Sequence, residues 1–330
     1  MKTQTSIDIS HKTIFFIATF LGILWLLFQI KEVILILFVA IIFMSALNPI
    51  VESLTKRSVP KGMAIALAYV VLIGIIVGLL TLIITPLTAE TSNLLFSLPQ
   101  TIQKLAPTLG VDKAVIQQEL SNASQHVLSL TLAVFSNFLT LISIAVLTFY
   151  LIIDRDRLYK LIISLSPNQK ERTEKLVLKI ENKLGAWLRG QVILSLVIGT
   201  MSYTLLFLLH IQYALPLSIL AGLMEVVPVI GPIVSAIPAI LIAYVESPAL
   251  ALFVGLGFFA IQQLENHFIV PQVMKRAVGL NPLIVILAIA IGGKLLGIAG
   301  GLLAVPITVV IQIILEDFLN IDLDTYSDKK

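Results

Sequence analysis

The apolar stretch from Leu215 to Tyr244 is long enough to cross a bilayer but contains too many helix breakers to cross as one straight helix. It is interrupted by Pro228, Gly231, Pro232 and Pro238, and Glu225 stands just before the first of them. Proline lacks a backbone N–H and crowds the preceding turn, so carbonyl oxygens near Glu225 lose their helical donors. At membrane depth such backbone is tolerated only against protein or a water-filled cavity. The stretch therefore predicts a broken or re-entrant helical hairpin beside a polar cavity.

A second apolar stretch, from Asn281 to Ile311, has the same layout. It begins with a proline, breaks at a glycine beside one ionisable residue, and has a second arm with a proline: Pro282, Gly297, Lys294 and Pro306. Paired hydrophobic segments interrupted by glycine and proline are the best sequence pointer to the binding site of a transporter. Cytoplasmic basic loops give the two stretches opposite orientations, as in an inverted repeat, so we expect the transport path where they meet.

The composition of the chain is that of a membrane protein. Of its 330 residues, 58% are hydrophobic and 12% charged, against about 45–50% and 25% in soluble domains, and the mean hydropathy is +1.02. Cysteine is absent, which excludes disulfides and thiolate metal sites. The net charge of +3 gives no reason to expect a nucleic-acid partner.

Motifs of catalysis are missing as well. The four histidines are scattered, and neither HExxH nor GxSxG occurs. We also expect no two carboxylates to lie together at depth in the membrane. The sequence therefore predicts no enzyme, no metal site and no cofactor apart from a coupling ion, either a proton or sodium.

The hydrophobic pattern and the basic loops predict an all-α polytopic protein with six full spans and two re-entrant hairpins. The spans are expected at residues 13–30, 33–50, 63–87, 131–153, 192–209 and 249–261. The expected units are N-terminal transmembrane helices (1–88), an external amphipathic subdomain (89–130), a span (131–153), a basic cytoplasmic helical segment (154–190), a transport core (191–315) and a cytoplasmic tail (316–330). The first span lacks a signal-peptide cleavage site and is interpreted as a retained anchor. Both termini are expected in the cytoplasm.

Glu225 is the sharpest single candidate for function. A carboxylate within a span normally faces a cavity or a partner, so it could bind a cation, carry a proton or hydrogen-bond a solute. Alternatively, it could hold the broken backbone by accepting N–H groups near Val227 and Val229. Lys294 could attract an anion or neutralise Glu225, or it could snorkel to the nearer interface.

Further candidates lie at the ends of the expected spans and in a glycine series. Gln262, Glu265 and Asn266, together with Gln263 and His267, could form the cytoplasmic mouth of the path or a solvated helix end. Trp187, Arg189 and Gln191 are interpreted as interfacial anchors. Gly293, Gly297 and Gly301 recur every four residues and predict a bare helical face for close packing.

Three segments carry a resemblance to a known family: GAWLRGQ at Gly185–Gln191, EVVPVIGPIVSAIPA at Glu225–Ala239, and the run from Gln263 to Pro306. On these segments, nearly the whole chain resembles the autoinducer-2 exporter (AI-2E) family of PerM-like permeases. The resemblance implies a multi-pass protein of the inner membrane, homo-oligomeric, that moves small polar signals or cations. Asn281 is also expected to line the transport path. It stands where the family is expected to carry histidine, so the resemblance gives that position no proton-handling role.

Together, these patterns predict a permease for a small polar solute, such as an autoinducer-2-like signal, with the lipid bilayer and further copies of the chain as partners. Glu225, Pro228, Gly231 and Pro232 would line the path, opposed by Lys294 and Gly297. A sodium (lithium)/proton antiporter, a channel and a non-transporting scaffold are the alternatives.

Overall fold

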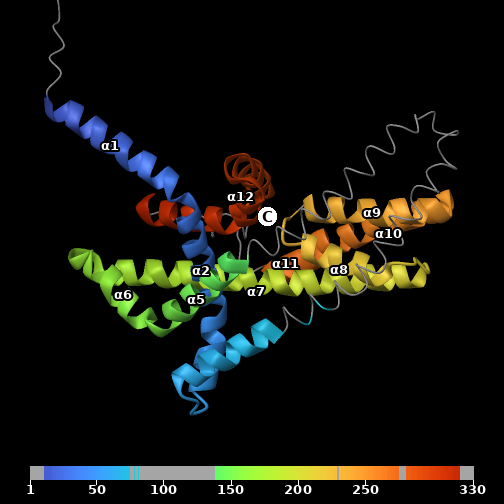
Figure 1. Cartoon of the computed structure of the whole chain (residues 1–330), viewed down its shortest axis with the longest axis horizontal. Helices are drawn as coiled ribbons and strands as arrows, with labels where there is room; N and C mark the ends of the chain where they lie inside the picture. Colours follow the sequence, from blue (N-terminus) through green and yellow to red (C-terminus); the bar gives the residue numbers. More distant parts are fainter. Residues whose placement is uncertain are drawn as a thin grey trace, which may run out of the picture.

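A computed structural model of the chain shows an assembly of helices arranged around one long helix (Figure 1). The structure describes residues 11–74, 78, 81, 138–228, 230–274 and 280–319, and all regular elements among them are helical. The expected external subdomain at 89–130 lies outside the described residues, as do most of the second half of the third span and the chain beyond 319. The prediction of an all-α polytopic membrane protein is confirmed.

The helices follow the predicted spans closely at the start of the chain. They are α1 (His11–Gln29), α2 (Lys31–Thr55), a helix over Lys61–Gly74, α5 (Phe138–Ile153), α6 (Arg155–Ser164), a 3₁₀ turn (Pro167–Gln169), α7 (Lys170–Leu208), α8 (Ala214–Met224), α9 (Ile230–Glu246), α10 (Pro248–Leu264), α11 (Val270–Met274) and α12 (Pro282–Leu319). Among the described residues, five helices are long and apolar enough to cross a membrane. The number of full spans stays a prediction.

The longest element, α7, is the frame on which the other helices pack. Its 39 residues would extend about 58 Å as an α-helix. It contacts α2, α6, α8, α10, α11 and α12, and α2 crosses it in Figure 1. The expected boundary at 190/191 between a cytoplasmic segment and the core falls inside α7, which runs through it without a break, and the division itself stays a prediction.

Two glycines near that boundary do not end the helix but allow other parts of the chain to pack closely against it. A β-carbon on Gly185 would collide with the carbonyl oxygen of Ser45 on α2, and one on Gly190 would meet the sulfur of Met274 on α11. A glycine inside a helical pattern can therefore mark a place where another backbone or side chain approaches.

The C-terminal boundary at 315/316 also falls within a helix, since α12 continues to Leu319. Two acidic residues assigned to the tail form ion pairs with the basic half of α7: Asp317 with Arg172 at 3.0 Å, and Glu316 with Lys179 at 2.9 Å. These pairs place the end of α12 beside the basic half of α7.

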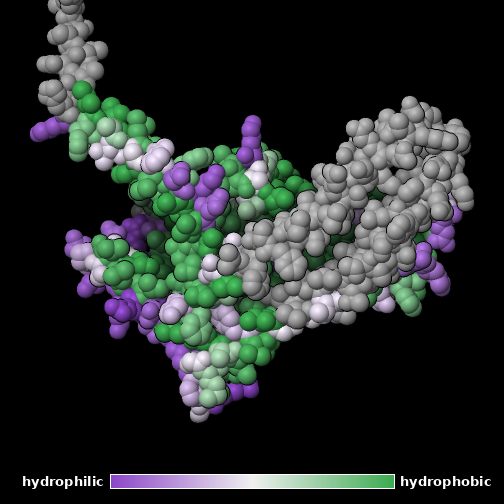
Figure 2. Space-filling model, in the orientation of Figure 1, coloured by the Kyte–Doolittle hydropathy of each residue, from purple (hydrophilic) through white to green (hydrophobic). Residues whose placement is uncertain are grey.

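The described surface is apolar over long stretches, as expected where helices meet lipid. Figure 2 shows hydrophobic side chains along α1 and over the central helices, with hydrophilic ones gathered at the ends. Phe15 and Trp25 on α1 are examples of large apolar side chains that are exposed in the isolated chain.

Candidate transport site

The first broken stretch folds back on itself as a helical hairpin. α8 ends at Met224 and α9 begins at Ile230, and the two helices pack against each other. Leu217 near the start of α8 shares a buried cluster with Ala239 and Ala243 in the second half of α9, so the two helices run antiparallel. The predicted hairpin is present in the chain, and its depth in a membrane stays a prediction.

Tight backbone contacts close the break between these helices. The N–H of Gly231 donates to the carbonyl of Val227 at 2.9 Å, and that of Ile230 donates to Pro228 at 2.8 Å. A β-carbon at position 231 would overlap the carbonyl oxygen of Met224. Glycine is therefore required here by close approach of the backbone.

The backbone at the break is also held from α7. The side-chain amide of Gln191 donates to the carbonyl oxygen of Glu225 at 2.7 Å, and Gln191 is only 3% exposed. The interpretation of Gln191 as an interfacial anchor does not fit this position. It fixes the backbone from α7 at the point where the chain turns.

The carboxyl group of Glu225 is buried beside a second carboxyl group. Glu225 is 2% exposed and Glu265 is 5% exposed, and the two side chains lie close enough to interact electrostatically. Gln262 donates to Oε2 of Glu265 at 2.9 Å, whereas Oε2 of Glu225 is buried and has no hydrogen-bond partner among the described residues. The expectation that no two carboxylates lie together at depth is wrong, because helix packing joins residues forty positions apart in the sequence.

The alternative role of Glu225, accepting N–H groups of the break, is not found at Val227, whose N–H donates to the carbonyl of Met224. Residue 229 lies outside the described residues. The side chain of Glu225 is itself sealed from solvent in this conformation.

Glu265 reaches this position from a π-helical turn, Glu265–Ile269, that joins α10 to α11. The N–H of Val270 donates to the carbonyl of Glu265, five residues earlier, and the next residue, Pro271, cannot donate at all. The helix continues past Pro271, since α11 extends to Met274. Single π turns inside α-helices occur frequently at functional sites.

The other residues of this polar cluster divide between the interior and the surface. Gln262 is half-buried and contacts both Glu265 and Asn266. Asn266 and His267 are exposed, and Nδ1 of His267 pairs with the carbonyl of Gln263 on its own helix. His267 therefore lies at a solvated helix end, the second of the two expected roles, while Gln262 and Glu265 belong to the buried site.

The second broken stretch also turns back, at Gly297. This residue has φ of 63° and ψ of −144°, a conformation that side-chain-bearing residues rarely adopt. The chain folds so sharply that β-carbons on Gly292 and Gly300 would collide with each other's backbone. The predicted bare face of Gly293, Gly297 and Gly301 is wrong in register, because a chain that folds back does not keep helical spacing. Gly293 faces open space, and Gly301 makes only an ordinary contact with Ile289.

The remaining candidates of the second stretch lie away from the carboxyl pair. Lys294 is exposed, and no described interaction joins it to Glu225. The side chain of Asn281 accepts the N–H of Leu283 at 2.9 Å and so caps the start of α12, while Pro306 is fully buried in the second arm. Among the described elements, α12 packs mainly on α7 rather than on α8 or α9. The two broken stretches do not pack extensively on each other in the described part of the chain, because each packs on its own part of α7: α12 near Trp187 and Leu194, and α8 near Gly199.

The other two expected anchors are structural members of the core. Trp187 is buried among residues of α2, α11 and α12. Arg189 donates to the carbonyl oxygens of Ser45 at 3.3 Å and Ala46 at 3.1 Å. Pro49 lies inside α2 four residues after Ser45 and removes the N–H that would normally bond to Ser45. Arg189 replaces it.

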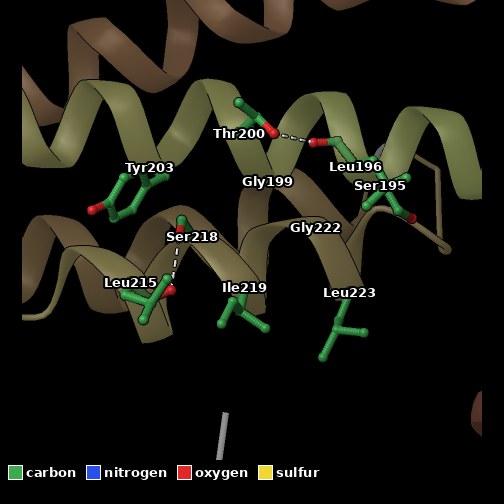
Figure 3. Close-up of a pocket in the computed structure, with 10 residues that line it drawn as sticks. All are labelled: Ser195, Leu196, Gly199, Thr200, Tyr203, Leu215, Ser218, Ile219, Gly222 and Leu223. Carbon is green, nitrogen blue, oxygen red and sulfur yellow. Dashed lines mark hydrogen bonds between the residues drawn. The ribbon is translucent and has the colours of Figure 1, made fainter. Parts of the chain in front are cut away.

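A groove of about 270 Å³ lies between α7 and α8, next to the hairpin. Figure 3 shows Gly199 and Gly222 at its centre, with Leu215, Ile219 and Leu223 pointing outward from α8. Ser195, Thr200, Tyr203 and Ser218 are among its lining residues. The hydroxyl oxygen of Ser195 is buried without a partner among the described residues, and the hydroxyls of Thr200 and Ser218 donate to carbonyls of their own helices. The α7–α8 contact at this groove therefore combines small, apolar and hydroxyl-bearing residues.

A polytopic helical protein with two broken hairpins and a buried acidic pair has the features of a membrane transporter, and comparison with known proteins agrees. The family model of the AI-2E family transporter matches residues 14–320. The chain belongs to the AI-2E family of transporters, as the resemblance predicted.

Three relatives illustrate this membership. "Putative transport protein YueF" of Bacillus subtilis (strain 168) is 30% identical over 300 residues, covering 83% of this chain and 80% of the relative. "Putative transport protein YrrI" of the same organism is 28% identical over 315 residues, covering 90% and 89%. "AI-2 transport protein TqsA" of Escherichia coli (strain K12) is 28% identical over 298 residues, covering 86% and 84%.

Proposed function

We propose that this chain is a permease that couples the movement of a small polar solute to a proton or a sodium ion at the Glu225–Glu265 pair. The observation that carries the proposal is the burial of two interacting carboxyl groups, each at its own helix irregularity: Glu225 at the end of α8 and Glu265 at the start of the π turn. A membrane transport function follows from the family; the coupling, the solute and the path are the proposal.

Charge balance is the physical basis of the coupling. Two adjacent carboxylates removed from water cannot both keep an uncompensated negative charge, so the pair must hold a proton or a cation. Gln262 supplies only one donor, to Glu265, and leaves Oε2 of Glu225 free to take the proton or to bind the ion. Carboxylate and carbonyl oxygens are also the ligands that hard cations prefer.

In this conformation the pair is occluded, so exchange of the ion requires movement of the hairpin formed by α8 and α9. The α7–α8 contact is suited to sliding because Gly199 and Gly222 bring the two helices together without large side chains. We assign the solute path to this seam, where movement of α8 would expose the hydroxyl groups of Ser195 and Ser218 that are buried in this conformation. Loading of the carboxyl pair would control the movement.

The solute we propose first is the autoinducer-2 signal, on the strength of the name of the relative TqsA. We place the protein in the inner membrane, with both termini in the cytoplasm as the basic loops indicate, and as a homo-oligomer. We assign it no catalytic activity.

Flux into proteoliposomes tests the proposal. With autoinducer-2 as the solute, an imposed pH or sodium gradient should accelerate uptake, and Glu225→Gln or Glu265→Gln should abolish that acceleration while the protein still folds and inserts. Glu246→Gln is the matched control, because Glu246 is exposed at the end of α9. Flux that ignores both gradients would indicate a channel, and no flux from a folded protein would indicate a scaffold; either result overturns the coupling.

The acidic pair also favours a second candidate, exchange of sodium or lithium for protons without an organic solute. A pH-sensitive dye inside the vesicles distinguishes the two functions. Proton movement driven by a sodium gradient alone, lost in both glutamine variants, would support the antiporter, whereas dependence on added autoinducer-2 would support the permease.

A further inference from the structure

The short helix α6 is fixed to the rest of the molecule by one face. Arg155 forms a double hydrogen bond with Glu181 on α7, at 2.9 and 3.0 Å, and the hydroxyl of Tyr159 donates to the same carboxylate. The guanidinium group of Arg155 also lies over the ring of Tyr159, 4.7 Å from its centre. These contacts hold α6 at a set rotation about its axis.

The opposite face of α6 combines exposed leucines with basic side chains. Leu161 is 61% exposed and Leu165, directly after the helix, is 76% exposed. Arg157 and Lys160 are exposed beside them and form no ion pair with another described residue. No residue of the helix is buried. In Figure 2, hydrophobic and hydrophilic patches lie side by side at this end of the molecule.

The position of α6 in the chain puts this face at the membrane surface. The helix begins two residues after the apolar α5 ends at Ile153, so it starts where a span leaves the bilayer. We propose that α6 lies in the headgroup layer of the cytoplasmic leaflet, with Leu161 and Leu165 at the acyl boundary and with Arg157 and Lys160 bound to the phosphates of anionic lipids. Helices with this combination of side chains lie in the interface, and the cytoplasmic leaflet attracts basic residues.

Charge favours lipid over a second copy of the chain as the occupant. The centres of protein interfaces are depleted in lysine, whereas here Lys160 is exposed directly beside Leu161. An anionic lipid surface satisfies the basic groups and the leucines at once.

The absence of cysteine allows a direct test on the full-length protein. A nitroxide is attached to a Leu165→Cys variant in phosphatidylcholine vesicles, and its accessibility to oxygen and to a water-soluble nickel complex is measured as phosphatidylglycerol is added. We expect the label to become accessible to oxygen and protected from nickel as the anionic lipid increases. Asn168→Cys, in the exposed 3₁₀ turn, should stay accessible to nickel.

Charge removal identifies the headgroup contact. Arg157→Gln with Lys160→Gln should weaken the affinity of α6 for the anionic surface by about fivefold for each charge removed, so that protection requires more phosphatidylglycerol. Lys170→Gln with Lys175→Gln removes the same charge from α7 and should leave the titration unchanged. Three results would overturn the proposal. The label could stay accessible to nickel, it could be equally protected without anionic lipid, or it could be shielded from both reagents by another copy of the protein.

Discussion

The bond between Arg189 and the broken turn of α2 predicts an energetic coupling between Arg189 and Pro49. Arg189→Met keeps an unbranched apolar stem but removes the donor to two carbonyl oxygens, those of Ser45 and Ala46. An unsatisfied buried acceptor costs about 1–3 kcal/mol, while hydrogen bonds between membrane helices average about 0.6 kcal/mol. We therefore expect the variant to lower the free energy of unfolding by about 2 kcal/mol.

In a Pro49→Ala background the same change should cost about 1 kcal/mol less, because the N–H restored at position 49 can bond to the carbonyl of Ser45. Equilibrium unfolding in mixed micelles measures both values through the fluorescence of the buried Trp187, after Trp25, the other tryptophan, is replaced by phenylalanine. Arg172→Met is the control, since Arg172 binds Asp317 on α12 and should be additive with Pro49→Ala. Costs of Arg189→Met that agree within about 0.5 kcal/mol in the two backgrounds would refute the reasoning.

Two glycine substitutions test the breaks themselves. Gly231→Ala should prevent the α8–α9 hairpin from closing, because its β-carbon overlaps the carbonyl of Met224, and folded yield in detergent should fall sharply; Gly255→Ala, whose nearest contact is 3.7 Å, should behave as the unmodified chain. Gly297→Ala should lower stability by about 1–3 kcal/mol, because it forces an L-residue into a glycine conformation. Gly293→Ala, in open helical surroundings, should be neutral or slightly stabilising in the same unfolding assay. If Gly255→Ala lowered folded yield as much as Gly231→Ala, or Gly293→Ala lowered stability as much as Gly297→Ala, this interpretation of the breaks would be contradicted.

The breaks in the chain could be predicted because they depend on local backbone chemistry. Pro228 lacks an N–H wherever it lies, and Gly297 can adopt positive φ whatever surrounds it. The sequence therefore located both turns to within a few residues. It could not show what each turn packs against, because that depends on contacts between distant parts of the chain.

The carboxyl pair illustrates this limit. Glu225 and Glu265 belong to different apolar stretches, and neither periodicity nor spacing indicates that helix packing brings them together. One signal was available: Pro271 lies six residues after Glu265 within a helical pattern, and an interior proline disturbs the hydrogen bonds of the preceding turn. The disturbance takes the form of the π turn from which Glu265 points inward. Similarly, Pro49 within α2 indicated that a donor from another helix was needed, although not that it would be Arg189.

The segment Gly185–Gln191 contacts several irregular parts of the chain at once. Within about two turns of α7, Gly185 admits the backbone of α2, Arg189 bonds to its freed carbonyls, and Gln191 bonds to the carbonyl of Glu225. The helix that steadies α2 therefore also holds the residue that carries the buried acid. If the α8–α9 hairpin slides along α7, the Gln191 bond must break, whereas the Arg189 bonds to α2 can remain. This asymmetry makes α2 and α7 the fixed part of the proposed transporter and the hairpin the moving part, with Gln191 at the junction between them.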